Sequence, residues 1–167
     1  MKDSAYRRLV VMRHAKTEQF ASNDRGRRLT GRGRRDATQA GRWLSTHGVV
    51  PDFVLISSAT RAVGTWERVR EGLGTSPRVR MLEELYSASV DDALELCALA
   101  PDSAVTVLMI GHNPTMAELA QALQREPQEK WAPHLPTSGL AVLDCDAAWD
   151  DMQPGVAALM HWYAPRG

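Results

Sequence analysis

The sequence predicts an α/β protein, a three-layer sandwich in which a mostly parallel central sheet has helices on both faces. Short apolar runs alternate along the chain with longer stretches of helical periodicity. The early runs are apolar throughout, as in strands that are covered on both sides. The 167 residues suit one domain with one sizeable core, so we expect a single domain over residues 1–167.

The predicted strands are short runs bounded by polar residues, glycine or proline. We expect buried strands at residues 9–12, 52–57 and 106–110, a short alternating strand at 78–82, and late strands at 138–143 and 156–163. Pro51 marks the break before the second strand.

The predicted helices cover residues 30–47, 58–73, 90–100 and 114–124. Thr30 is a candidate N-cap of the first helix, and Gly48 lies just past its end. Pro114 stands in the first turn of the last helix, where proline is tolerated. Residues 18–29 are polar and basic without periodicity and therefore predict a loop.

The net charge is zero, but the charges are unevenly distributed. The first 42 residues hold 12 basic and 4 acidic side chains, and the remainder holds 8 basic and 16 acidic ones. The basic third, with Arg25, Arg27 and Arg28, is consistent with attraction of an anionic ligand or with a solvated loop and helix face. We expect no nucleic-acid partner, because the block RGRRLTGRGRR has no interleaved aromatic side chains for base stacking.

Neither a membrane nor an oxidising compartment is indicated. No apolar stretch approaches the ~20 residues of a membrane span, and the first apolar run is too short for a signal peptide. Cys97 and Cys145 are far apart without CxxC spacing, so we expect two buried free thiols. We therefore expect a cytoplasmic protein without a membrane partner.

Polar residues follow three of the predicted strands directly. RHAKT follows VVM, SSATR follows VLI, and GHNPT follows VLMI. Ligands bind outside the carboxyl ends of parallel strands, so these side chains are expected to converge. The converging residues are Arg13, His14, Ser57, Ser58, Arg61, His112 and Asn113.

Such a set suits a phosphoryl group. Arginine carries a permanent charge and a fork of donors that matches phosphate oxygens, and two helix N-termini would favour the same anion. A neutral histidine can attack phosphorus, while flanking cations reduce the repulsion and stabilise the transition state. The arginines provide this positive charge, so we expect neither a metal nor another cofactor.

The three motifs RHAKT, SSATRAVGTWE and GHNP, in this order, resemble those of the histidine phosphatase superfamily, also called phosphoglycerate-mutase-like. The resemblance covers residues 8–143. The short chain and the stretch DRGRRLTGRGRRDA are similar to the SixA-type phosphohistidine phosphatase branch in particular.

The resemblance implies a phosphoglycerate-mutase-like fold and assigns roles by position. His14 would be the nucleophile, Arg13 and Arg61 would clamp the phosphate, and His112 would stabilise its charge. Many members have an acid after the middle strand; in LEELY we prefer Glu84 to Glu83, although SixA-type members can lack this acid.

Other residues near the strand ends receive weaker assignments. Ser57, Thr17 and Asn113 are candidate substrate-binding residues, although Ser57 and Asn113 are also candidate helix caps. His47, His134 and His161 lack ligand spacing. We expect packing roles for the five tryptophans, Trp43, Trp66, Trp131, Trp149 and Trp162.

The leading hypothesis is a metal-independent phosphatase that acts through a phosphohistidine at His14. Its substrate would be a phosphohistidine protein or a small phosphoester. One alternative is a phosphate- or phosphoprotein-binding module without turnover, which would need the arginines but not two histidines. A phosphoglycerate-type mutase is a further alternative, but it needs a closed pocket for which the chain looks too short.

Overall fold

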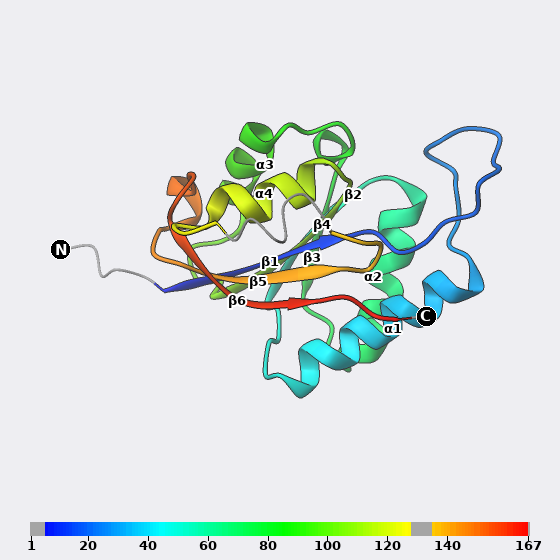
Figure 1. Cartoon of the computed structure of the whole chain (residues 1–167), viewed down its shortest axis with the longest axis horizontal. Helices are drawn as coiled ribbons and strands as arrows, with labels where there is room; N and C mark the ends of the chain where they lie inside the picture. The colour runs from blue at the N-terminus through cyan, green and yellow to red at the C-terminus, as the bar shows by residue number, and fades with distance from the viewer. Residues whose placement is uncertain (1–5, 128–134, 167) are drawn as a thin grey trace.

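The fold is a six-stranded sheet between two layers of helices, seen in a computed structural model of the chain (Figure 1). The structure describes residues 6–127 and 135–166. The strands are β1 (Arg7–Arg13), β2 (Phe53–Ser57), β3 (Arg78–Leu82), β4 (Thr106–Gly111), β5 (Leu140–Cys145) and β6 (Ala157–Tyr163). The helices are α1 (Gly31–Thr46), α2 (Thr60–Leu73), α3 (Val90–Leu96) and α4 (Thr115–Leu123).

The sheet has the order β3-β2-β4-β1-β5-β6. Strands β1 to β4 are parallel where they pair, whereas β5 runs antiparallel to both β1 and β6. The prediction of a mostly parallel sheet with helices on both faces is therefore confirmed. Because β2, β4 and β1 are neighbours, the three segments that follow them leave the same edge of the sheet.

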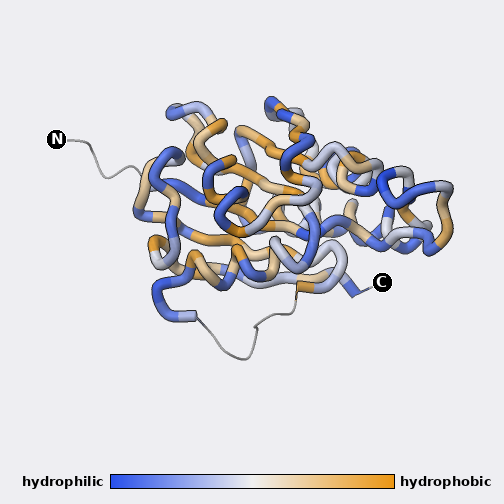
Figure 2. The backbone as a smooth tube through the Cα atoms, turned by 90° about the horizontal axis from the view of Figure 1, so that it is seen from above, coloured by the Kyte–Doolittle hydropathy of each residue, from blue (hydrophilic) through white to orange (hydrophobic). Residues whose placement is uncertain are grey.

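Alternation along β1 explains the two faces of the sheet. Leu9 and Val11 contribute to the apolar cluster that includes α3 and α4, whereas Val10 and Met12 contribute to the cluster that includes α1 and α2. All four side chains are fully buried. In Figure 1, α3 and α4 accordingly lie above the sheet, and α1 and α2 lie below it. Figure 2 shows the apolar stretches running through the middle of the molecule and the hydrophilic ones at its outer turns.

Helix α1 begins where the sequence indicates. The Thr30 side chain accepts a hydrogen bond from the Gly33 amide at 2.9 Å, so the predicted N-cap is confirmed. The helix predicted to reach residue 100 is shorter: α3 ends at Leu96, and a 3-10 turn, Cys97–Leu99, follows it. The strand expected from residue 138 starts only at Leu140, because Ser138 adopts a left-handed backbone with φ 60°.

The remaining sequence predictions concern burial. Cys97 and Cys145 are free and buried, as expected, and burial raises the pKa of each thiol to about 12. Trp66 and Trp149 pack in the core. Trp131 and His134 lie outside the described residues. Within the described ranges, the helices are all too short or too polar to cross a bilayer.

Candidate active site

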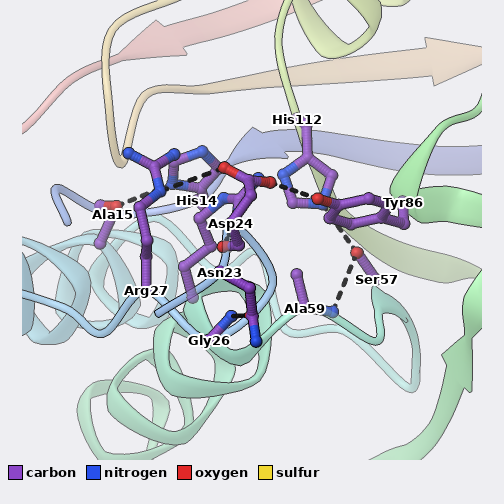
Figure 3. A network of polar contacts seen from close by, with 11 residues as sticks. His14, Ala15, Asn23, Asp24, Gly26, Arg27, Ser57, Ala59, Tyr86 and His112 are labelled. Atoms are coloured by element: carbon purple, nitrogen blue, oxygen red, sulfur yellow. Dashed lines mark hydrogen bonds and ion pairs between the residues drawn. The ribbon is translucent and has the colours of Figure 1, made fainter. Parts of the chain in front are cut away.

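The carboxyl ends of β1, β2 and β4 bring His14, Ser57 and His112 together at one edge of the sheet (Figure 3). The ring centroids of His14 and His112 are 5.3 Å apart. Parallel pairing in register, with Arg13 opposite Gly111, makes the two chains leave the sheet side by side. The convergence predicted from the three motifs is thus present in the structure for the two histidines.

His14 is held at three points and is only 7% exposed. Its amide donates to the Gly111 carbonyl at 3.0 Å, and its carbonyl accepts from the Ser138 amide at 3.1 Å. Its ring Nδ1 lies 2.8 Å from the carbonyl oxygen of Ala15. A carbonyl can only accept, so Nδ1 carries the proton and, in the neutral ring, Nε2 carries the lone pair.

Burial keeps this ring neutral. Together with smaller contributions from nearby His112, Arg61 and Arg13, burial lowers the pKa of His14 to about 3. The hydrogen bond to Ala15 acts in the opposite direction but is outweighed. At neutral pH, His14 therefore offers an unprotonated nitrogen to an electrophile, which is what nucleophilic attack requires.

His112 is oriented by a buried hydroxyl. Its Nε2 lies 2.7 Å from Oγ of Ser57, and this oxygen accepts a hydrogen bond from the Ala59 amide at 3.3 Å. The Nδ1 of His112 is buried without a partner among the described residues. Desolvation lowers the pKa of His112 to about 4, with Arg61 as the next cause. Ser57, a candidate substrate ligand in the sequence, thus contacts His112.

Arg61 comes from the first turn of α2 and is 6% exposed. Its Nη1 donates to the Asp24 carbonyl at 2.8 Å, and its Nη2 donates to the Asp24 carboxylate at 3.1 Å. The same carboxylate accepts from the Tyr86 hydroxyl and lies 3.2 Å from Nε of Arg27. The hydrogen bond from Tyr86 is the largest cause that lowers the pKa of Asp24, so this carboxylate is ionised at neutral pH.

Arg13 and Asn113 share one acceptor. Nη1 of Arg13 donates to the Leu135 carbonyl at 3.3 Å, and the Asn113 side chain donates to it at 2.8 Å. Oδ1 of Asn113 accepts from the amide of Ala117, the third residue of α4, at 3.3 Å. Asn113 therefore anchors a turn and a helix, whereas Nε of Arg13, like Nε of Arg61, is buried without a partner among the residues described.

The two glutamates after β3 have different surroundings. Glu83 accepts a hydrogen bond from Ser58 at 3.0 Å and pairs with Arg25. The Ser58 hydrogen bond, followed by Arg25, lowers the pKa of Glu83. Glu84, the residue preferred from sequence, is exposed and has no hydrogen bond or ion pair to any residue within the described ranges. The structure thus brings Glu83 to the rim of the site and leaves Glu84 apart from it.

The loop between β1 and α1 brings Asp24 to Arg61. A β-bridge between Thr17 and Leu29 closes the base of this loop. Thr17, a candidate substrate-binding residue from the sequence, thus lies at the base of the loop. The Asn23 side chain accepts from the Gly26 amide at 2.8 Å and forms a turn, and the Arg25 carbonyl accepts from the Thr60 amide at 3.0 Å. Two of the loop arginines, Arg25 and Arg27, pair with carboxylates, as opposed to being freely solvated.

Sequence reasoning missed Asp24 and Tyr86. One signal was available for Asp24, because it is the only carboxylate among residues 19–35, a stretch that holds six arginines. Tyr86 had no such signal. Its ring meets His112 edge-on with centroids 5.4 Å apart, and the Arg25 guanidinium lies 4.3 Å from its centroid.

The fold and the site together define a class: an α/β protein with two neutral histidines and buried arginine at the carboxyl edge of its sheet. Residues 9–90 match the histidine phosphatase superfamily (branch 1). The chain belongs to this superfamily.

Three proteins are similar to this chain over nearly its whole length. The uncharacterized protein Rv1276c of Mycobacterium tuberculosis is 37% identical over 93% of this chain and 100% of its own. A structure assigned to phosphohistidine phosphatase SixA of Nakamurella multipartitia is similar with a TM-score of 0.88, 34% identity and coverage of 97% of this chain and 98% of that one. The protein histidine phosphatase SixA complexed with tungstate gives a TM-score of 0.80, 26% identity and coverage of 94% and 96%. The fold is thus that of the SixA-like, phosphoglycerate-mutase-like phosphatases.

Proposed function

We propose that the protein is a metal-independent phosphatase that transfers a phosphoryl group to Nε2 of His14 and then to water. The observation that carries the proposal is the 2.8 Å contact between Nδ1 of His14 and the Ala15 carbonyl, because it fixes the tautomer that leaves Nε2 free to attack. The proposal treats residues 1–167 as one domain, which both apolar clusters on the single sheet support.

In the first step, Nε2 of His14 attacks phosphorus and forms a P–N bond while the bond to the leaving group breaks. The electron pair of that bond goes to the leaving atom, which takes up a proton. Arg13 and Arg61 supply positive charge beside the phosphoryl oxygens, and each has a buried Nε without a partner in the described part of the chain. With the Ser57 hydroxyl donating to Nε2 of His112, Nδ1 carries the proton and is the third group available to hold an oxygen.

In the second step, water attacks the phosphohistidine, the P–N bond breaks and its electron pair returns to Nε2. Inorganic phosphate leaves and neutral His14 is restored, since burial disfavours its protonated form. Glu83, placed at the rim by Ser58 and Arg25, replaces Glu84 as our candidate for proton transfer to the leaving group. Because its pKa is lowered, it must first take up a proton, so substrates with good leaving groups should react most readily.

We propose a phosphohistidine protein as the substrate class, with a small phosphoester as the alternative. The SixA-like relatives support the first, because two of them are described as phosphohistidine or protein histidine phosphatases. The tungstate complex of one relative supports an oxyanion site, since tungstate is tetrahedral like phosphate. We expect the protein to act on this substrate in the cytoplasm.

The first experiment measures hydrolysis of p-nitrophenyl phosphate in excess EDTA by the wild type and by His14→Ala. The proposal expects turnover that survives the chelator and is lost in the variant. Acid-labile, base-stable label on the protein after a rapid quench would identify the phosphohistidine. If the folded wild type binds phosphate but also fails to hydrolyse a phosphohistidine protein, the protein is a binding module. Transfer of label to a second phosphoglycerate instead of water would indicate a mutase.

A further inference from the structure

A second concentration of positive charge lies along the outer side of α1 and α2, away from His14. It surrounds a cavity of about 510 Å³. Arg34, Arg35, Arg42 and Arg68 line this cavity, with Thr38 and Gln39 between them. We call this feature the arginine groove.

Little of the charge in the groove is neutralised by the protein. Arg68 pairs with Glu71 at 3.2 Å, and Nη1 of Arg34 donates to the Leu29 carbonyl at 3.0 Å. The side chains of Arg35 and Arg42 are exposed and have no hydrogen bond or ion pair to a residue within the described ranges. The groove therefore presents at least two free guanidinium groups beside two partly engaged ones.

The arrangement works against the helix that carries it. Helix α1 has no acidic residue in its first turn, while Arg32, Arg34 and Arg35 all stand among its first five residues. Positive charge at a helix N-terminus opposes the helix dipole, and like charges on one face repel. Asp36 pairs with Arg32 and offsets only part of this charge. Clustered arginines near the N-terminus of α1 lower its stability without a structural gain, and such a conflict is typical of residues kept for binding.

The spacing and lining of the groove favour one kind of ligand. Arg35 and Arg42 are seven residues apart, so about 10 Å of helix axis separates them. An extended peptide with acidic side chains spans this distance and can engage both arginines at once. The lining includes no aromatic side chain on which a nucleic-acid base would stack.

We propose that the arginine groove docks an acidic peptide segment of a protein partner. The end of the groove at Gly31 is close to the nucleophile loop, since the Thr30 amide donates to the Lys16 carbonyl at 3.0 Å. A partner held there would be bound beside the strand edge that carries His14. The proposal concerns binding and does not depend on the reaction at His14.

The test measures anisotropy of a fluorescein-labelled polyglutamate peptide, at low salt and with tungstate in excess to occupy the oxyanion site. The groove variant Arg35→Glu/Arg42→Glu is compared with Arg78→Glu/Arg80→Glu, which makes the same charge change at exposed positions of β3. We expect about tenfold weaker binding or more in the groove variant and about twofold or less in the control. Arg35→Glu reduces the positive charge near the N-terminus of α1, and both positions are exposed, so the groove variant should remain folded, which thermal unfolding checks.

Equal peptide affinity in the wild type and the groove variant would overturn the proposal, as would equal losses in both variants. Displacement of the peptide by tripolyphosphate or single-stranded DNA at a lower concentration than unlabelled polyglutamate would also overturn it, in favour of those ligands. Hydrolysis of p-nitrophenyl phosphate is followed in parallel and should be unchanged in the groove variant. Loss of peptide binding with no hydrolysis by any of the proteins would support the groove while refuting the proposed phosphatase.

Discussion

Both terminal nitrogens of Arg61 face Asp24, one donating to its carbonyl and the other to its carboxylate. A guanidinium has five N–H donors, so these two bonds leave three, including the buried Nε that has no partner among the residues described. Arg61 can therefore hold Asp24 and an oxyanion at the same time. We infer that Asp24 positions the guanidinium and leaves the side that carries Nε for the ligand.

Replacement of Asp24 by alanine should lower kcat/KM by about tenfold, since it removes a hydrogen bond between charged groups. Asp24→Asn retains an acceptor for Nη2 of Arg61 and should recover most of this loss. Calorimetric titration with tungstate should show the same order of affinities. Tighter tungstate binding and faster turnover in Asp24→Ala would contradict this role and show that the carboxylate competes with the anion.

The hydroxyl of Ser57 is expected to matter through His112. Ser57→Ala removes the 2.7 Å contact to Nε2 and leaves a buried ring nitrogen without a partner, so we expect kcat/KM to fall about tenfold. With p-nitrophenyl phosphate, whose leaving group needs little help from an acid, Ser58→Ala is the matched control, because the neighbouring hydroxyl bonds to Glu83 instead of His112. Steady-state kinetics of both variants decide the matter, and equal effects would argue against a specific link to His112.

The two glutamates after β3 can be separated by leaving-group dependence. If Glu83 protonates the leaving group, Glu83→Gln should slow phenyl phosphate by about 100-fold and p-nitrophenyl phosphate much less. Glu84→Gln should alter neither rate, since its side chain is exposed and unpaired among the described residues. The reverse pattern would restore Glu84, and a uniform response to both substrates would mean that neither is the acid.

The ligand-free protein should become less stable as the pH falls from about 7 to about 4. The pKa values of His14 and His112, about 3 and about 4, lie below the ~6.5 of a free histidine, so the unfolded chain takes up these protons first. At pH 5 the loss is roughly 2 kcal/mol for His14 and less for His112, whose ring is more exposed to solvent. Urea unfolding at about pH 7 and at about pH 5 measures this loss of unfolding free energy.

The variants His14→Asn and His112→Asn supply the control for this pH dependence. Each removes one titrating ring, so each should flatten the fall in unfolding free energy between about pH 7 and about pH 5. Saturating tungstate should reduce the fall as well, because an anion favours the protonated rings. An unchanged slope in both variants would show that other groups carry the pH dependence.

Regular parts of the structure could be predicted because their signals are local. Apolar runs of fixed length gave the strands, and Thr30 alone indicates the start of α1. The meeting of His14 and His112 followed from the rule that parallel strands end at one edge, applied to two motifs. Family resemblance supplied the roles that the residues alone left open, and these roles still await the tests above.

Contacts made by the irregular loop were not predictable in the same way. Asp24 reaches Arg61 only because the turn at Asn23 and the Arg25–Thr60 hydrogen bond direct it, and neither has periodicity. Glu83 and Glu84 are adjacent in sequence, so pattern cannot separate them; the 3-10 turn Glu83–Tyr86 does, by directing one toward Ser58.

Helices α1 and α2 approach each other at Gly41 and Gly72. A Cβ added to Gly41 would lie 2.1 Å from the Val69 carbonyl oxygen, and one added to Gly72 would lie 2.2 Å from that of Thr38. The spacing between the helices is therefore set by bare backbone. Because α2 also carries Arg61 in its first turn, a side chain at either glycine would displace the helix that positions this guanidinium. Two glycines outside the candidate site are therefore needed for the packing on which Arg61 depends.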